Sequence, residues 1–280
     1  MDDTRRAHLN LIDSSRLLFG LDPGAEVEDE PGWLLGAGSA SHPAISNAAF
    51  RRDDAADPDE LIARAKRFFG ERGRGFSVWC RDGQNGDRDL LAAADAAGLQ
   101  LVYAMPEMTL GAPVEAPALP PGAELRRLTT GEEAEDYWKV AAASYASLGF
   151  PPEVFAGYTD HAGLLAGNVA AFLAYLEGEP VAIALTIVSE GVAGIYWVGT
   201  LEQARGKGLG QAVTAAATNA GFELGPDLAS LQASPMGKPI YEAMGYETVF
   251  EYRLLMSSPS QGAYERHRRP TGQSASDGSL

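Results

Sequence analysis

The chain has 280 residues, of which 45% are hydrophobic and 21% charged, a balance typical of a globular protein rather than a disordered one. Its formal net charge of -16 at pH 7 disfavours binding to polyanions such as nucleic acid or anionic membranes. No apolar run approaches the roughly 18 residues that span a bilayer, and the N-terminus lacks the apolar segment of a signal peptide. We therefore expect a cytoplasmic protein with no nucleic-acid or membrane partner.

The chain contains a single cysteine, Cys80. One cysteine excludes an internal disulfide framework and a multi-cysteine metal site, so we interpret Cys80 as a small buried hydrophobic residue and predict no metal.

The first half contains one helix with clear start signals. Asp57 is a good N-cap and Pro58 follows it in the first turn, so we predict a helix that runs to Phe69. Helical spacing predicts that one face is buried, formed by Leu61, Ile62, Ala65, Phe68 and Phe69. The preceding Arg51 and Arg52 are followed by acidic residues and by no glycine-rich loop.

A proline-rich stretch divides the chain. Residues 111–122 carry four prolines without helical or strand periodicity, which is typical of a semi-rigid extended linker. It separates a first domain, residues 1–110, from a second, residues 123–256. The polar tail, residues 257–280, is rich in small residues, and we expect it to be disordered.

The second half predicts a mixed α/β sheet with helices packed on it. "TGEEAEDYWKVAAASYASLG" has the cap and stop signals of a helix, and a shorter helix is expected after Pro151. Three apolar strands with turns between them follow, up to Thr200. The remaining predicted elements are a glycine loop, a helix to about Leu224, a strand at "ASLQAS", a helix at "PIYEAM" and a strand at "TVFEYRLLM".

The ends of the two halves resemble each other. "AADAAGLQLVYAMPEMTL" and "IYEAMGYETVFEYRLLMS" both run from an alanine-containing helix through a glycine, Gly98 or Gly245, into a strand. This shared unit indicates two related domains in tandem.

The loop "RGKGLG", Arg205 to Gly210, combines three glycines with two cations between a strand and a helix. A P-loop would need a glycine where Leu201 stands, and a dinucleotide fingerprint would need one at Gln211, so both are excluded. Glycines in this position let main-chain N–H groups approach an anion at the positive end of a helix. The loop therefore predicts a pyrophosphate site.

These residues carry a resemblance to a known family. The loop fits the [Q/R]-x-x-G-x-[G/A] pattern of the GNAT acetyltransferase superfamily, and "LQASPMGKPIYEAMGYE" is similar to that family's next motif. The resemblance covers residues 123–256, whereas residues 1–110 look like a degenerate GNAT-like half without a donor site. It implies acetyl-CoA as the acetyl donor.

The resemblance also implies roles for individual residues. Val198 and Thr200 would offer main-chain hydrogen bonds to the pantetheine arm, and Ser234, which ends the strand of the second motif, would also bind the cofactor. Tyr241 would protonate the departing thiolate. The loop residues that would hold the pyrophosphate are Arg205, Gly206, Lys207, Gly208, Leu209 and Gly210.

The general base stays open at this stage, because "VAGIYWVGT" contains no carboxylate. Glu190 falls in a turn, His161 has no assigned role, and a water relay is preferred. We expect an N-acetyltransferase that acts on a small primary amine, with a non-catalytic acyl-CoA sensor and a protein or peptide acetyltransferase as alternatives. The acceptor, the oligomeric state (including a homodimer) and the role of the first half stay open.

Overall fold

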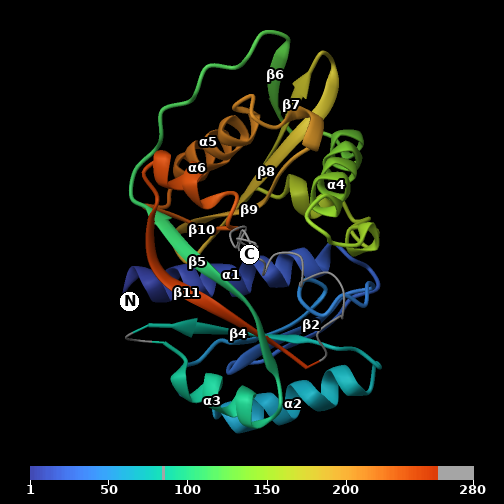
Figure 1. The fold of residues 1–280 in the computed structure, drawn as a ribbon, viewed down its shortest axis with the longest axis vertical. Coiled ribbons are helices and arrows are strands. Elements are labelled where there is room, and N and C mark those ends of the chain that lie inside the picture. The colour runs from blue at the N-terminus through green and yellow to red at the C-terminus, as the bar shows by residue number, and fades with distance from the viewer. Residues whose placement is uncertain (84–85, 258–280) are drawn as a thin grey trace, which may run out of the picture.

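The computed structural model describes residues 1–83 and 86–257 (Figure 1), so the predicted disordered tail lies outside the described residues except for Ser257. The described chain forms one eleven-stranded sheet with the strand order β1-β2-β3-β4-β11-β5-β10-β9-β8-β7-β6. The fold is a mixed α/β architecture, as predicted. Within the described residues, no helix is both long and apolar enough to cross a membrane.

The first half supplies five strands and three helices. Asp57 caps α2 by accepting hydrogen bonds from the N–H groups of Asp59 and Glu60, and all five residues predicted for the buried face of this helix are buried. The prediction for this helix is confirmed. The elements are α1 (Asp3–Gly20), β1 (Glu26–Asp29), β2 (Trp33–Ala37), β3 (Asn47–Arg51), α2 (Pro58–Gly70), β4 (Ser77–Asp82), α3 (Arg88–Ala96) and β5 (Gln100–Leu110).

The second half follows the predicted order of elements, except that it begins with β6, a strand that was not predicted. Thr130 caps α4 in a reciprocal capping box with Glu133, whereas the helix expected after Pro151 is only a short 3-10 turn. The elements are β6 (Ala123–Arg127), α4 (Gly131–Ala146), η1 (Pro152–Val154), η2 (Ala162–Leu165), β7 (Val169–Leu176), β8 (Glu179–Ser189), β9 (Val192–Thr200), η3 (Glu202–Ala204), α5 (Leu209–Glu223), β10 (Leu228–Gln232), α6 (Lys238–Ala243) and β11 (Glu247–Met256).

The proline-rich segment between the halves has neither helix nor strand. It is nevertheless fixed to the second half, because the main-chain N–H and C=O of Val114 both bond to the side-chain amide of Asn219 on α5, at 2.9 Å each. In Figure 1 this segment is the long green connection that leads from β5 to β6.

Each half completes its part of the sheet with the last strand of the other half. β5 lies between β10 and β11, and β11 lies between β4 and β5. The two strands cross the middle of the molecule side by side (Figure 1). Gly98 and Gly245, which precede them, adopt positive φ angles of 84° and 94°. The repeat seen in the sequence therefore corresponds to this exchanged central pair of strands.

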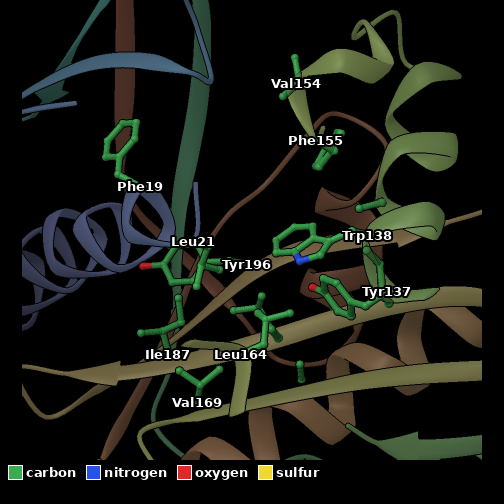
Figure 2. Packing of buried hydrophobic residues seen from close by; sticks show 14 of the residues in the cluster. Phe19, Leu21, Tyr137, Trp138, Val154, Phe155, Leu164, Val169, Ile187 and Tyr196 are labelled. Carbon is green, nitrogen blue, oxygen red and sulfur yellow. The ribbon is translucent and has the colours of Figure 1, made fainter. Parts of the chain in front are cut away.

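The sheet of the second half has a core on each face. On one face, α1 and α4 cover residues of β7, β8 and β9 that include Leu173 and Ile183. Figure 2 shows this cluster, with Tyr137 and Trp138 of α4 beside Leu164. On the other face, α5 covers alternate residues of the same strands, such as Ala182 and Ala184. Residues one position apart therefore serve different faces.

Candidate functional site

The sheet opens between two parallel strands of the second half. β9 and β10 pair from Val192 with Leu228 to Gly194 with Ser230, and their pairing ends there. The remaining residues of β9 stay bonded to β8, and those of β10 stay bonded to β5. The two strands therefore diverge, and the main chain of β9 from Ile195 to Thr200 borders the opening.

A β-bulge distorts β9 where it borders this opening. Ile183 of β8 pairs with Gly199 and Leu185 pairs with Tyr196, so β9 carries one extra residue between these pairs. Trp197, within the bulge, has a φ of 49°. Non-glycine residues in this left-handed region cost of order 1–3 kcal/mol and cluster at functional sites. The strained main chain at the bulge therefore indicates that this part of β9 belongs to a functional site.

Two tyrosines of α4 hold the bulge. The Tyr137 hydroxyl donates to the main-chain oxygen of Trp197 at 3.4 Å, and the Tyr145 hydroxyl donates to that of Val198 at 3.3 Å. Burial raises the pKa of both phenols, so each remains a proton donor at neutral pH. These contacts fix the main chain at the level where the strands diverge.

The glycine loop lies at the end of β9 and starts α5. Gly206 and Gly208 adopt φ angles of 75° and 78°, and Gly208 is the N-cap of α5. Within the described residues no side chain caps this helix, and a Cβ at either glycine would meet nothing within 4 Å. The first N–H groups of α5 have no partner within the helix, and they carry its partial positive charge. This arrangement suits a phosphate-sized anion.

The other residues predicted for the loop secure it or face solvent. Leu209 is buried in the core beneath α5, and a Cβ at Gly210 would come within 3.0 Å of Oγ1 of Thr200. The Arg205 N–H donates to the Glu202 carbonyl oxygen at 3.3 Å. Lys207 is exposed.

The Arg205 side chain ties the loop to its neighbours. Its Nε donates to the Thr200 carbonyl oxygen at 3.2 Å, and its Nη2 donates to Oγ of Ser147 after α4. This guanidinium therefore fastens the loop to β9 and α4, while Lys207 is the cation of the loop that faces outward.

The second motif places Ser234 and Tyr241 on the other side of the opening. Oγ of Ser234 accepts a hydrogen bond from the Gly237 N–H at 3.1 Å, which shapes the turn before α6. Tyr241 is buried against the core beneath α5 and α6. Burial raises its pKa, and its phenol in turn raises the pKa of Tyr145. Phenols from α6 and α4 therefore lie within electrostatic reach of each other.

Buried ion pairs occupy the corresponding region of the first half. There the parallel pairing of β3 and β4 ends at Phe50 with Trp79, and Arg51 follows on β3. Its guanidinium bonds to Asp89 at 2.8 Å, while Arg81 of β4 bonds to Asp87 at 2.8 Å. Both arginines are buried. Arg51 therefore serves an internal ion-pair network.

The acidic candidate from the second half lies away from the opening. Glu190 adopts a φ of 54° in the hairpin between β8 and β9, at the opposite end of β9 from the glycine loop. Its carbonyl oxygen accepts a hydrogen bond from Arg6 of α1. His161 is the residue before η2. The hairpin interpretation of Glu190 is confirmed.

The sequence analysis missed one carboxyl group, because it lies in the first half. Glu107 of β5 is fully buried opposite Gln232 of β10. Its Oε2 accepts a hydrogen bond from the Gln232 amide at 2.7 Å, and burial raises its pKa to about 8. An acidic residue within an otherwise apolar strand was the available signal, but only the exchange of strands brings it beside the second half.

A sheet that opens between two parallel strands, with a glycine loop at the start of the next helix, defines an acetyltransferase fold. Residues 117–231 match the family model described as "Acetyltransferase (GNAT) domain", which confirms the resemblance of the second half to the GNAT superfamily. No curated protein matches the chain.

Solved structures show the same fold over most of the chain. A GCN5-related N-acetyltransferase from Kribbella flavida is 22% identical with a TM-score of 0.67, and the match covers 88% of this chain and 94% of that one. Another from Sphaerobacter thermophilus is 15% identical with a TM-score of 0.60, over 82% and 81%. A "Tandem GNAT protein from the clavulanic acid biosynthesis pathway" is 15% identical with a TM-score of 0.57, over 90% and 88%.

Proposed function

We propose that this protein is a cytoplasmic, acetyl-CoA-dependent N-acetyltransferase that moves an acetyl group to a primary amine of a small molecule by direct attack. The observation that carries the proposal is the uncapped glycine loop at the end of the opening between β9 and β10. An anion site and an unpaired strand edge together match a ligand with a pyrophosphate and an amide-containing arm.

The residues fit this donor. The main-chain N–H groups from Gly206 to Gly210 would hold the pyrophosphate, with Lys207 as the nearby cation. The pantetheine arm would lie as an added strand along Val198 and Thr200. Since Tyr145 already donates to the Val198 oxygen, the arm would share or replace that bond.

The chemistry needs a polarised carbonyl and a proton for the leaving thiolate. A main-chain N–H at the bulge around Val198 would polarise the thioester carbonyl without a side chain, as oxyanion sites do. Tyr241 would donate the proton. Its raised pKa keeps it protonated at neutral pH, and its phenol is near enough to influence Tyr145, which donates to the Val198 oxygen.

The first half supports a single donor site. Its corresponding region holds two buried arginines paired with aspartates and no glycine loop, so a second pyrophosphate would have to break ion pairs that are already satisfied.

The test is thiol release from acetyl-CoA by the purified full chain against a panel of amines. Polyamines and aminoglycosides belong in the panel because the net charge of the chain is strongly negative, and peptides with free amines test the protein-directed alternative. Turnover of a small amine, with the acetylated product identified by mass, supports the proposal. Tight coenzyme A binding without turnover of any panel member favours the sensor instead.

A further inference from the structure

Glu107 is a buried carboxyl group without an ion pair among the described residues. Its side chain is fully buried in β5 and its Oε2 accepts a hydrogen bond from Gln232. The Ser230 side chain also lies close enough to lower the pKa of this carboxyl by hydrogen bonding, but not in good hydrogen-bond geometry with Oε1. Buried acids are rare unless they are paired. A buried acid that has only neutral donors and no ion pair among the described residues therefore has a cost that packing does not explain.

The position of Glu107 along the sheet coincides with the start of the opening. β9 and β10 last pair at Gly194 with Ser230, and Gln232, the partner of Glu107, lies two residues further along β10. Ser230 and Gln232 share one face because side chains alternate along a strand, and Glu107 shares it because it lies directly opposite Gln232. The buried Ser230 side chain lies close enough to Glu107 to lower the pKa of that carboxyl by hydrogen bonding.

Glu107 and Tyr241 belong to opposite faces of the sheet. Leu231, between Ser230 and Gln232, packs in the same core as Tyr241 beneath α5 and α6. Glu107 therefore faces the other way, toward α1. Attack of an amine on a thioester releases a proton from nitrogen and consumes one at sulfur. A carboxylate on one face could accept the proton from nitrogen, and a phenol on the other face could donate the proton to sulfur.

The face of Glu107 is unusually polar for a protein core. α1 contributes His8, Asn10 and Ser14, all fully buried. The Tyr196 hydroxyl of β9 donates to Asn10 at 2.7 Å, and the Tyr252 hydroxyl of β11 is bonded to His8 at 2.8 Å. Each of these elements therefore supplies a hydrogen-bonding group to the face on which Glu107 lies.

Among the ionisable groups on this face, Glu107 is the one whose protonation changes near neutral pH. Burial, with a smaller contribution from Glu107, raises the pKa of both Tyr196 and Tyr252, so both phenols keep their protons. Burial lowers the pKa of His8 to about 4, so this imidazole is neutral. Arg81 and Asp87 lie beyond Tyr252 and His8 and form an ion pair with each other.

We propose that Glu107, supplied by the first half, is the general base of the transfer and accepts at Oε1 the proton that the attacking amine loses. The inference rests on the proposed function. The N–C bond forms as the C–S bond breaks, the nitrogen proton goes to Glu107, and the thiolate takes a proton from Tyr241. The products are an amide and a free thiol. Proton exchange with solvent then returns Glu107 to its ionised form and Tyr241 to its protonated form. The active site is thus built from both halves.

The test compares Glu107→Gln with Glu247→Gln, which removes an exposed carboxylate at the start of the neighbouring strand β11. With an amine that the unchanged protein acetylates, kcat of Glu107→Gln should fall about 10²–10⁴-fold, the usual contribution of a positioned base. Affinity for coenzyme A, measured by calorimetry, should change less than about twofold, because the donor contacts are elsewhere. Glu247→Gln should match the unchanged protein in both measurements.

The pH dependence separates a base from a structural acid. At each pH the ratio of kcat/KM between the unchanged protein and Glu107→Gln cancels the ionisation of the acceptor amine. This ratio should rise with pH through a group whose pKa is about 8 and then level off. A structural role predicts a flat ratio.

Each outcome decides the proposal. A normal rate or a flat ratio in a folded Glu107→Gln overturns the role of Glu107 and leaves the proposed function intact, whereas an unchanged protein that acetylates no amine overturns both. If Glu107→Gln does not fold, Glu107→Asp replaces it. The aspartate variant should keep the pH dependence with a lower kcat, and full activity there contradicts the need for a positioned carboxylate.

Discussion

Substituting Gly208 by valine tests whether the glycine loop binds the donor. A Cβ at this position meets nothing within 4 Å, but φ is 78°, so the change strains the main chain without creating a clash. The left-handed conformation costs an L-residue roughly 1–2 kcal/mol. In a chain of this size the melting temperature falls about 2–4 °C for each kcal/mol. We therefore expect Gly208→Val to melt roughly 2–8 °C lower and to remain folded.

The expected effect on donor binding is larger. If valine turns two N–H groups of the loop away from the pyrophosphate, two hydrogen bonds to a charged group are lost, worth about 1.5–3 kcal/mol each. Affinity for coenzyme A should then fall about 10²–10⁴-fold. The measurement is calorimetric titration of the folded variant with coenzyme A.

The other end of the same helix provides the control. Gly225 directly follows α5, has a φ of 107° and also has open space around a Cβ. Gly225→Val should lower the melting temperature comparably, with no loss of coenzyme A affinity. If both variants bind normally, or both lose binding to the same extent, the assignment of the loop is wrong.

Three further predictions concern the donor, its stoichiometry and the interior. Tyr241→Phe should lower the single-turnover acetylation rate about 10²–10⁴-fold while coenzyme A affinity stays within about twofold; a normal rate would refute the role of Tyr241 as the acid. Calorimetry should give one coenzyme A per chain, and two equivalent sites would contradict the loss of the donor site from the first half. Burial lowers the pKa of His8 from an ordinary 6.5 to about 4 in the folded chain, so its protonation favours the unfolded chain. The contribution of His8 to stability should therefore be complete above pH 6.5 and fall by about 3 kcal/mol as the pH drops to 4. Glu107 has a raised pKa and ionises over the same range with the opposite effect on stability, so the His8 contribution is the difference between the unchanged protein and His8→Gln. Urea unfolding across this range measures the loss, and His8→Gln should remove most of it.

Local signals in the sequence were sufficient for most of the second half. The threonine cap of α4, the three apolar strands and the glycine loop each lie within short stretches whose residues determine their own conformation. The buried face of α2 followed from helical spacing in the same way. The repeat around Gly98 and Gly245 identified two related strands, although not that they exchange places.

Features that depend on distant pairing were beyond the sequence patterns. The bulge at Trp197 arises from its register with β8, and no residue preference marks it. Glu107 was not a candidate because its partners Ser230 and Gln232 are in the other half of the chain. Buried polar residues of α1 likewise have their hydrogen-bond partners, Tyr196 and Tyr252, far along the sequence, so no local pattern predicts them.

The exchange of β5 and β11 has a consequence for how the chain is made. Ser77 of β4 pairs with Met256 of β11, so the first half emerges from the ribosome long before its missing strand is synthesised. Until then β4 and β5 both present unpaired edges, which are sites for association with other chains. The sheet of the first half therefore stays incomplete during synthesis until β11, the last strand of the chain, pairs with β4 and β5.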